Sequence, residues 1–147
     1  MTQLTDEYFM REALKEAEKA YEAKEVPVGA IVVGHHQIIA RAHNQVEQLQ
    51  DATAHAEMLA LTAAFNHIGG KYLLACTLYV TLEPCCMCAG AAYWAQLGRL
   101  VFGAHDVQRG YTTVGKHLLH PRTEVSKAVL SEKAAQQLTH FFQSLRH

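Results

Sequence analysis

Two short stretches of this sequence carry complementary metal-binding groups and therefore have to meet in the fold. The first contains His55 and Glu57, and the second is Pro84-Cys85-Cys86-Met87-Cys88. Together they supply one imidazole, two thiols and one carboxylate. Three protein ligands of these types bind zinc and leave a fourth position for water. The pair of stretches therefore predicts a hydrolytic zinc enzyme.

The spacing of the two cysteines has a mechanical reason. Proline suits the first turn of a helix because that position needs no N–H donor, so Pro84 predicts that a helix starts there. Cys85 and Cys88 then lie three residues apart on one helix face and can reach the same metal ion. The positive end of the helix dipole favours their thiolate forms, which are the forms that bind zinc. Cys86 points elsewhere.

The histidine stretch is expected at the start of a second helix. Thr53 is a suitable N-cap, which places His55 and Glu57 in the first turn. Residues two apart do not share a helix face, so Glu57 is better placed beside a metal-activated water than as a fourth ligand. A carboxylate there can move protons between water and a leaving nitrogen. The alternatives are a histidine that only forms a hydrogen bond and a redox dithiol, and neither gives Glu57 a role.

The order of these residues matches a known signature. His-x-Glu followed by Pro-Cys-x-x-Cys is characteristic of zinc-dependent nucleobase deaminases, and both halves are complete here. Either half alone would be a weak signal. Together, in this order and with a predicted strand between them, they favour deamination.

Length and composition limit the class of protein. The chain has 147 residues, half of them apolar and 18% charged, which predicts one domain over residues 1–147 with a core that needs no disulfides. Cys76 and Cys86 have no evident partners, so the four cysteines do not form a secreted framework. Residues 1–25 lack the apolar run of a signal peptide, and no segment is long enough to span a membrane. We expect a cytoplasmic protein.

The charge is distributed unevenly along the chain. Residues 1–97 contain 6 Lys and Arg against 11 Asp and Glu, whereas residues 98–147 contain 7 against 3. Five of the ten histidines also lie in the second part. This end of the chain either contacts a phosphate backbone or is simply a solvated mixed surface. A basic open groove around Arg109, Lys116 and Arg122 would favour RNA, and a small closed pocket would favour a free base.

The predicted elements give a three-layer α/β/α sandwich around a mixed sheet of about five strands. A strand, a helix and a strand over residues 77–102 predict a crossover with parallel pairing. His35 and His36 are expected at an exposed hairpin tip rather than in a metal site. The expected helices cover 6–24, 53–68, 84–94 and 131–145, the strands 26–33, 37–40, 77–82, 99–102 and 124–130, and the long connections 43–52 and 103–121.

One residue of the loop 43–52 is a binding candidate. Loops that join a strand to a helix often carry binding residues. The amide of Asn44 offers a donor and an acceptor, which suits the edge of a heterocyclic base. The same side chain is equally suited to cap a turn.

The chain as a whole resembles the cytidine deaminase superfamily, and within it the bacterial tRNA-specific adenosine deaminases. The resemblance runs along almost the whole chain, and its most discriminating stretches are those outside the metal motifs. The matching stretches are Glu25-Val26-Pro27-Val28-Gly29-Ala30, Thr53-Ala54-His55-Ala56-Glu57, Leu78-Tyr79-Val80-Thr81-Leu82-Glu83-Pro84-Cys85, Met87-Cys88-Ala89-Gly90-Ala91 and Val101-Phe102-Gly103-Ala104.

This resemblance implies a substrate, a cofactor and a set of site residues. It implies a homodimer that converts the wobble adenosine of a tRNA anticodon stem-loop to inosine, with one Zn²⁺ per chain. Two further readings stay open: a deaminase of free purine or pyrimidine bases or nucleosides, which Ala92-Tyr93-Trp94-Ala95 also resembles, and a non-catalytic zinc or dithiol module. The implied residues are His55, Cys85 and Cys88 for zinc, Glu57 for proton transfer, and Asn44, Val28, Ala104, Asp106 and Phe142 for substrate binding.

Overall fold

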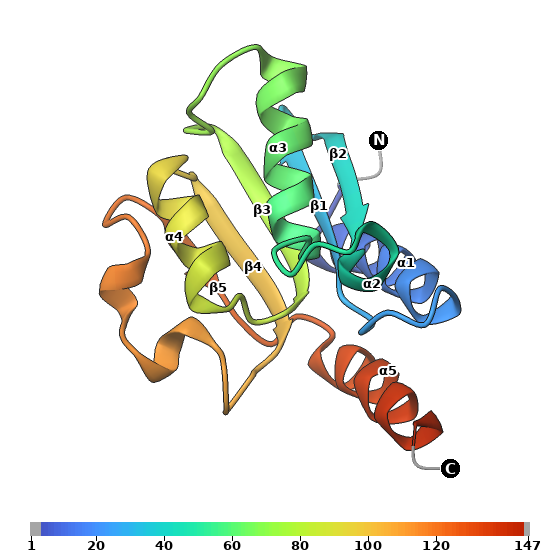
Figure 1. Cartoon of the computed structure of the whole chain (residues 1–147). Coiled ribbons are helices and arrows are strands. Elements are labelled where there is room, and N and C mark those ends of the chain that lie inside the picture. The colour runs from blue at the N-terminus through green and yellow to red at the C-terminus, as the bar shows by residue number, and fades with distance from the viewer. Residues whose placement is uncertain (1–3, 146–147) are drawn as a thin grey trace.

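The computed structural model describes residues 4–145 and shows five strands in one sheet with helices on both sides (Figure 1). The order of strands across the sheet is β2-β1-β3-β4-β5. The elements are α1 (Asp6–Glu22), β1 (Gly29–Gly34), β2 (Gln37–His43), α2 (Val46–Leu49), α3 (Ala56–Ile68), β3 (Cys76–Leu82), α4 (Cys86–Trp94), β4 (Arg99–Ala104), the 3₁₀ turns η1 (Tyr111–Thr113) and η2 (Lys116–Leu118), β5 (Glu124–Ser126) and α5 (Ser131–Ser144).

The sheet is mixed, as the sequence predicted. Strand β1 pairs antiparallel with both β2 and β3, whereas β3, β4 and β5 run parallel to one another. Helix α4 connects β3 to β4, which is the predicted parallel crossover. Parallel strands end at the same edge of a sheet, so the segments that follow β3 and β4 start side by side. The three-layer α/β/α prediction is confirmed.

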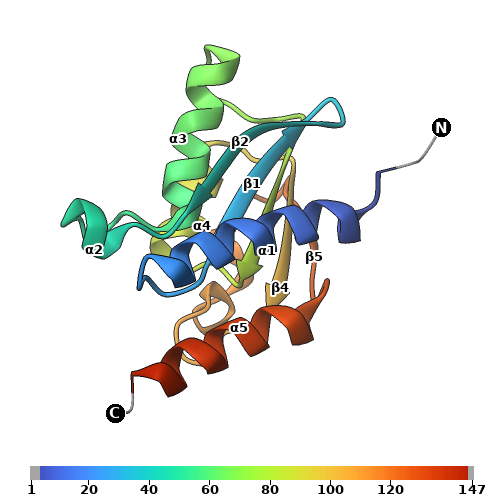
Figure 2. The ribbon, with the colours of Figure 1, turned by 90° about the vertical axis from the view of Figure 1, so that its right-hand side faces the viewer.

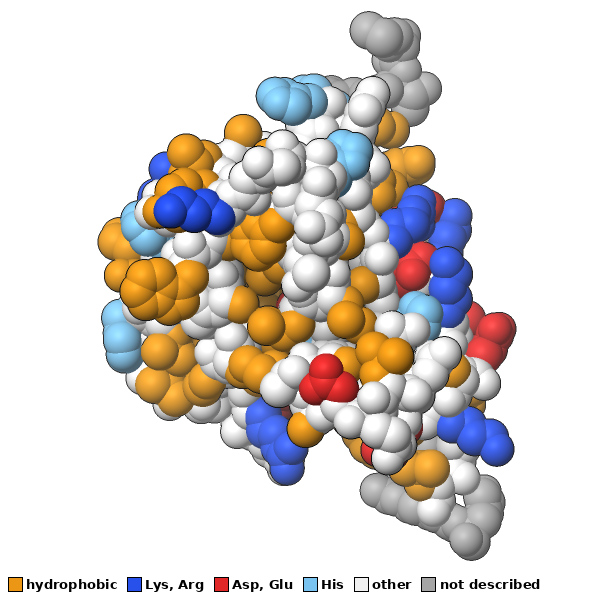
Figure 3. All heavy atoms as spheres, turned by 45° about the horizontal axis from the view of Figure 1, so that its top comes forward, with side chains coloured by type: hydrophobic (Ala, Val, Ile, Leu, Met, Phe, Trp, Pro, Cys, Tyr) orange, Lys and Arg blue, Asp and Glu red, His pale blue; other side chains and the backbone are white. Residues whose placement is uncertain are grey.

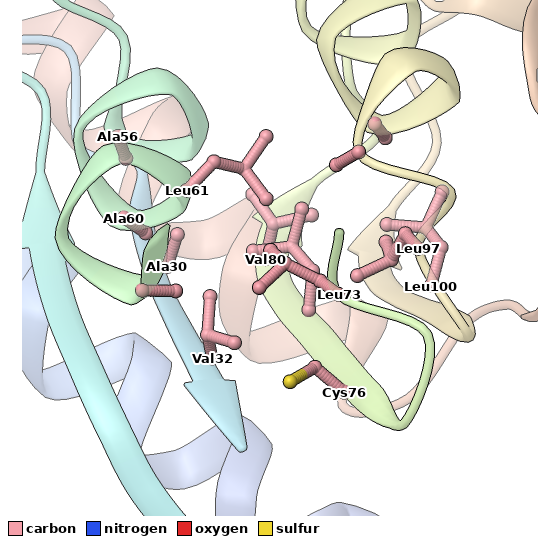
Figure 4. Close-up of a cluster of buried hydrophobic side chains, with 14 of the residues drawn as sticks. Ala30, Val32, Ala56, Ala60, Leu61, Leu73, Cys76, Val80, Leu97 and Leu100 are labelled. Carbon is pink, nitrogen blue, oxygen red and sulfur yellow. The ribbon is translucent and has the colours of Figure 1, made fainter. Parts of the chain in front are cut away.

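Side chains alternate between the two faces of the sheet and divide the core in two. On one face, Val32, Val80 and Leu100 pack against α3 and α4, and Figure 4 shows Leu61 of α3 pointing toward this cluster. On the other face, Ile31 and Val101 pack against α1. Figure 2 shows α1 and α5 together in front of the strands, with α3 on a different side. The sheet is thus covered on both faces, which requires its central strands to be apolar at nearly every position.

The hairpin tip is a tight turn. His35 and His36 both have left-handed backbone conformations, with φ of 50° and 65°, as the two central residues of a type I′ turn require. Both side chains are exposed. Neither joins a group of potential metal ligands in residues 4–145.

Several predicted boundaries were wrong. The loop 43–52 contains the short helix α2, and the last strand covers only Glu124–Ser126 instead of 124–130. Helix α3 begins at Ala56 with His55 as its N-cap residue, because the hydroxyl of Thr53 instead donates to Asp51. Helix α4 begins at Cys86, so Pro84 precedes the N-cap instead of occupying the first turn.

The buried side of the last helix, α5, is narrower than its sequence pattern predicts. Helical spacing in the sequence predicts that Leu138, Phe141 and Phe142 form the buried side of α5, but Phe142 is 46% exposed while Phe141 is buried. Within residues 4–145, no helix combines the length and the apolar character that crossing a membrane requires.

Candidate active site

The potential zinc ligands come from the starts of two helices at one end of the sheet. His55 is the N-cap residue of α3, and Cys85 is the N-cap residue of α4. Cys88 lies in the first turn of α4 and is buried. The Nδ1 atom of His55 is 3.6 Å from the Sγ atom of each cysteine. The structure therefore brings together the three residues that the sequence singled out.

The three ligand atoms have the spacing of a tetrahedral zinc site. They all lie within 4.8 Å of one another. Zinc bonds of about 2.3 Å to sulfur and about 2.0–2.1 Å to nitrogen, at a tetrahedral angle, separate the two atoms by about 3.6 Å. The Nδ1–Sγ distances agree with this value. In residues 4–145 no fourth His, Cys, Asp or Glu joins the group. Three protein ligands are the number found in catalytic zinc sites.

The two thiols differ in their tendency to ionise. A hydrogen bond from the Cys88 thiol and the nearby His55 ring lower the pKa of Cys85 to about 4, against the opposing effect of burial. The same hydrogen bond and burial raise the pKa of Cys88. Interaction with Cys85 raises the pKa of His55. The chain thus supplies one thiolate at neutral pH, and a bound divalent cation would displace the proton of the second thiol.

Glu57 lies beside this cluster and is 4% exposed. It belongs to the first turn of α3, and its carboxyl group lines the same cavity as His55 and Cys85. Burial removes water from the carboxylate and raises its pKa to about 7. A buried carboxylic acid that gains and loses its proton near neutral pH is suited to proton transfer.

Asn44 occupies the start of α3 from a neighbouring loop. Its side-chain oxygen accepts a hydrogen bond of 2.8 Å from the backbone N–H of Ala56, and its own backbone N–H donates to Val28. The side chain therefore caps the helix that carries His55 and Glu57, which was one of the two roles considered from the sequence. It also lines the cavity, and its NH₂ group is the part that can reach a ligand.

A cavity of about 930 Å³ extends from the potential zinc ligands His55 and Cys85 to α5. This volume is at the upper end of the range of small-molecule sites, about 300–1,000 Å³. Its rim includes Val107 and Leu145, which are 73% and 63% exposed, so the cavity opens widely to solvent. It is lined by Lys24, Glu25, Val26, Val28, Asn44, Val46, Glu47, His55, Glu57, Leu82, Glu83, Cys85, His105, Asp106, Val107, Gln108, Arg109, Leu138, Phe141, Phe142 and Leu145.

Four of the five predicted substrate contacts line this cavity: Val28, Asn44, Asp106 and Phe142. The fifth, Ala104, is buried at the end of β4 and does not line it; its carbonyl oxygen accepts a hydrogen bond from the N–H of Glu83.

The carboxylate of Asp106 is already engaged within its loop. It accepts hydrogen bonds from the backbone N–H groups of Gln108 and Arg109. Asp106 therefore shapes the cavity rim as well as lining it.

The three cations expected around one basic groove are separated. Arg109 lines the main cavity. Lys116 lines a second cavity of about 700 Å³ near the end of α4, and the guanidinium of Arg122 donates to the carbonyl oxygen of Leu74. The three cations therefore do not form the shared groove that would favour RNA, and of the three only Arg109 lines the cavity that contains His55 and Cys85.

The sequence reasoning assigned no role to two buried acids at this site. The carboxylate of Glu25 accepts hydrogen bonds from the N–H groups of Glu47 and Gln48 and so caps α2. Burial of Glu83 favours its neutral form, but hydrogen bonds from Thr112, Asp106 and His105 together hold its pKa below the ordinary value. Their positions in the sequence could have indicated burial, because Glu25 directly precedes a strongly apolar segment and Glu83 directly follows one.

Known proteins share this sequence and fold. Residues 3–104 match the family model described as the cytidine and deoxycytidylate deaminase zinc-binding region. The chain is 44% identical to a tRNA-specific adenosine deaminase of Aquifex aeolicus, covering 96% of each protein. It is 46% identical to the corresponding protein of Bacillus subtilis, covering 99% of this chain and 92% of that one.

A solved structure also superposes on nearly the whole chain. It comes from a study of A-to-I editing by tRNA:A34 deaminases at the wobble position of transfer RNA. The TM-score is 0.83 at 37% sequence identity, with 89% of this chain and 99% of the other covered. Sequence and structure therefore point to the same group of proteins.

Proposed function

The chain belongs to the cytidine and deoxycytidylate deaminase zinc-binding family, and on this premise we propose that it converts the wobble adenosine of a tRNA anticodon loop to inosine. One observation carries the proposal. His55, Cys85 and Cys88 meet beside the buried carboxylate of Glu57, in a chain that matches tRNA-specific adenosine deaminases over nearly its full length.

The proposed reaction replaces the amino group of adenine with oxygen. One zinc ion per chain, held by His55, Cys85 and Cys88, would lower the pKa of a water molecule toward neutrality and so make it nucleophilic. Glu57 accepts a proton from the attacking water and delivers it to the amino group, which leaves as ammonia. The amide of Asn44 holds the edge of the base. The products are inosine and ammonia, and no oxidant or reductant is needed.

The shape of the cavity fits a nucleotide presented by a loop. A base in a single-stranded anticodon can be extruded at lower cost than a base in a duplex. The wide opening leaves room for neighbouring nucleotides, and the exposed ring of Phe142 on the rim offers a surface for stacking. Arg109 on the same rim is suited to a phosphate group. For this substrate we propose a cytoplasmic location.

We also propose that the protein acts as a homodimer. Trp94 at the end of α4 is 77% exposed, and Tyr72, Leu74 and Val114 are exposed as well. Figure 3 shows a face on which hydrophobic side chains gather and most Lys and Arg side chains lie toward the margins. Large exposed aromatic groups are characteristic of the centres of protein interfaces. A second copy of the chain is the occupant that this family suggests.

The substrate is tested by comparing RNA with free bases. Purified protein is incubated with an anticodon stem-loop carrying adenosine at the wobble position, and separately with free guanine, cytosine, adenosine and cytidine. We expect inosine from the stem-loop and no turnover of the small molecules, with one zinc per chain by elemental analysis. Turnover of free bases alone would replace the RNA assignment. A fourth protein ligand on the zinc, detected by X-ray absorption, would instead indicate a non-catalytic site.

A further inference from the structure

Glu83 makes an unusually complete set of contacts for a residue outside the reaction. Its side chain is fully buried at the point where β3 ends, two residues before Cys85. One carboxylate oxygen accepts hydrogen bonds from the backbone N–H and the hydroxyl of Thr112, at 3.0 and 2.7 Å. The other accepts from the N–H of Asp106 at 3.1 Å and pairs with the ring of His105. All four donors belong to one segment.

That segment, residues 105–112, forms part of the cavity wall and is called the rim loop below. It contributes His105, Asp106, Val107, Gln108 and Arg109 to the lining. Its backbone is also tied to the metal-bearing turn. The N–H of Tyr111 donates to the carbonyl oxygen of Pro84 at 2.9 Å, and Cys85 forms an isolated antiparallel bridge with Gly110. The Glu83 carboxylate holds both ends of the rim loop, and the backbone contacts of Gly110 and Tyr111 reinforce its second end.

Gly110 shows how closely the loop and the carboxylate approach. A Cβ atom added at Gly110 would lie 2.1 Å from Oε2 of Glu83 and 2.7 Å from the carbonyl oxygen of Asp106. The backbone φ of Gly110 is −64°, which any residue adopts, so the need for glycine here is a matter of space alone. The nearest atoms to this added Cβ belong to the carboxylate of Glu83.

We propose that Glu83 is a positioning residue that fixes the rim loop relative to the metal ligand Cys85 and thereby sets where the RNA lies over the reacting base. Burying a carboxylate is costly unless its oxygens are hydrogen-bonded, and here the rim loop supplies the bonds. Errors of about 1 Å in such placement cost about 10²-fold in rate. This inference rests on the proposed function.

The competing explanation is that Glu83 only helps the domain to fold. General destabilisation lowers the fraction of active protein and the zinc content, but it does not change KM. A displaced rim loop raises KM for the RNA and leaves zinc in place. The split between KM and kcat therefore separates the two roles.

The test uses a small set of variants of the full-length zinc-loaded protein. Glu83→Gln keeps the shape but places an NH₂ group against N–H and O–H donors. Thr112→Val removes one donor, and Thr112→Ser restores it. Gly110→Ala pushes the carboxylate away by steric contact. Gly70→Ala is the matched control, because its added Cβ would meet only Cγ2 of Ile68 at an ordinary 3.7 Å.

We expect kcat/KM for the stem-loop to fall by about ten- to a hundredfold in Glu83→Gln and Gly110→Ala, with a rise in KM as the main part of the change. We expect a smaller rise in Thr112→Val, recovery in Thr112→Ser, and no change in Gly70→Ala. Zinc content should be unaffected. Amide hydrogen exchange should become faster at Asp106 and Thr112, whose backbone N–H groups donate hydrogen bonds to Glu83.

Two results would overturn the inference. One is an unchanged KM and unchanged exchange at those two amides in Glu83→Gln. The other is a loss of zinc in proportion to the loss of activity. That result would mean that Glu83 only supports the turn that carries Cys85. If the proposed function is wrong, the unmodified protein will not convert the stem-loop at all. The exchange measurement would then still show whether Glu83 holds the rim loop.

Discussion

At the scale of single residues, Glu57 is the acid on which the proposed chemistry depends. It is buried, lines the cavity and lies beside the three potential zinc ligands without belonging to that group. In Glu57→Gln we expect kcat to fall by about 10²–10⁴-fold, because proton transfer to and from the reacting groups is lost. Zinc content should stay at the unmodified level. Single-turnover inosine formation and elemental analysis measure the two quantities.

A glutamine variant with near-normal kcat and full zinc would remove Glu57 from the mechanism. Loss of zinc in this variant would instead indicate that Glu57 supports the group of zinc ligands. His67→Gln is a suitable control, because His67 lies near the far end of the same helix, away from the cluster.

Asn44 combines two tasks that a pair of substitutions can separate. Its side-chain oxygen caps α3, and the residue lines the cavity, where its NH₂ group is the donor it can offer to a base. Asn44→Asp keeps an acceptor for the Ala56 N–H, so thermal stability should be retained while kcat/KM falls with the lost donor. Asn44→Ala loses both groups and should also be destabilised by about 1 kcal/mol. Thermal denaturation and kcat/KM of the two variants give the comparison. Equal stability of both variants would contradict the capping role.

At the scale of elements, the sequence predicted which segments are helices and strands better than where they begin. Alternating burial and the glycine stop at Gly69 are local signals, and the structure follows them. The helix starts depend on long-range partners instead. Thr53 is a good N-cap by residue type, but Asn44, at the other end of the preceding loop, supplies the acceptor, so α3 starts later.

The same reasoning applies to the site. The sequence could predict that His55, Cys85 and Cys88 meet, because a chemical signature fixes their spacing, and it could single out Asn44 as an amide near the motif. The hydrogen bonds that the rim loop donates to Glu83 could not be predicted in this way, because their donors lie more than 20 positions further along the chain. No local pattern in a sequence reports which loop will fold back onto a strand end. Exposure of Phe142 was missed for a similar reason, since helical spacing does not say how much of a face is covered.

Helix α1 is attached to the sheet by an ion pair that makes a pH-dependent prediction. Arg99 of β4 donates two hydrogen bonds to Asp6, at 2.8 and 2.6 Å, and Tyr79 donates a third. The Arg99 guanidinium holds the pKa of Asp6 below its ordinary value. This contribution to stability is fully present above the unfolded pKa of about 3.9 and is lost as the pH falls through the lower folded pKa.

Asp6→Asn should therefore reduce the free energy of unfolding by about 1 kcal/mol at neutral pH. The difference from the unmodified protein should shrink below about pH 4, when the carboxyl group of the unmodified chain is protonated. Denaturant unfolding at several pH values measures it. Glu7→Gln is the control, because Glu7 lies in the same turn and pairs with the exposed Arg11. A difference that stays constant down to the lowest pH would rule out the ion pair as its source.

At the scale of the whole molecule, the two faces of the sandwich have different surroundings. Helices α1 and α5 contact each other and cover one face of the sheet. On the other face, α4 ends with the exposed ring of Trp94, which packs edge-on against Tyr93 and otherwise meets solvent. An exposed tryptophan costs free energy that contact with a second chain would recover. The asymmetry supports dimerisation through the α4 side.

Trp94→Glu should therefore convert the dimer to a single chain, because a carboxylate at the centre of an apolar interface is left without a partner. The measurement is molecular mass by sedimentation equilibrium over a range of concentrations. Tyr8→Glu is the matched control: Tyr8 is an exposed aromatic residue on α1, on the opposite side of the sheet, and its replacement should leave the mass unchanged. A Trp94→Glu protein that keeps the mass of two chains would place the interface elsewhere, and an unmodified protein with the mass of one chain would contradict the proposed homodimer itself.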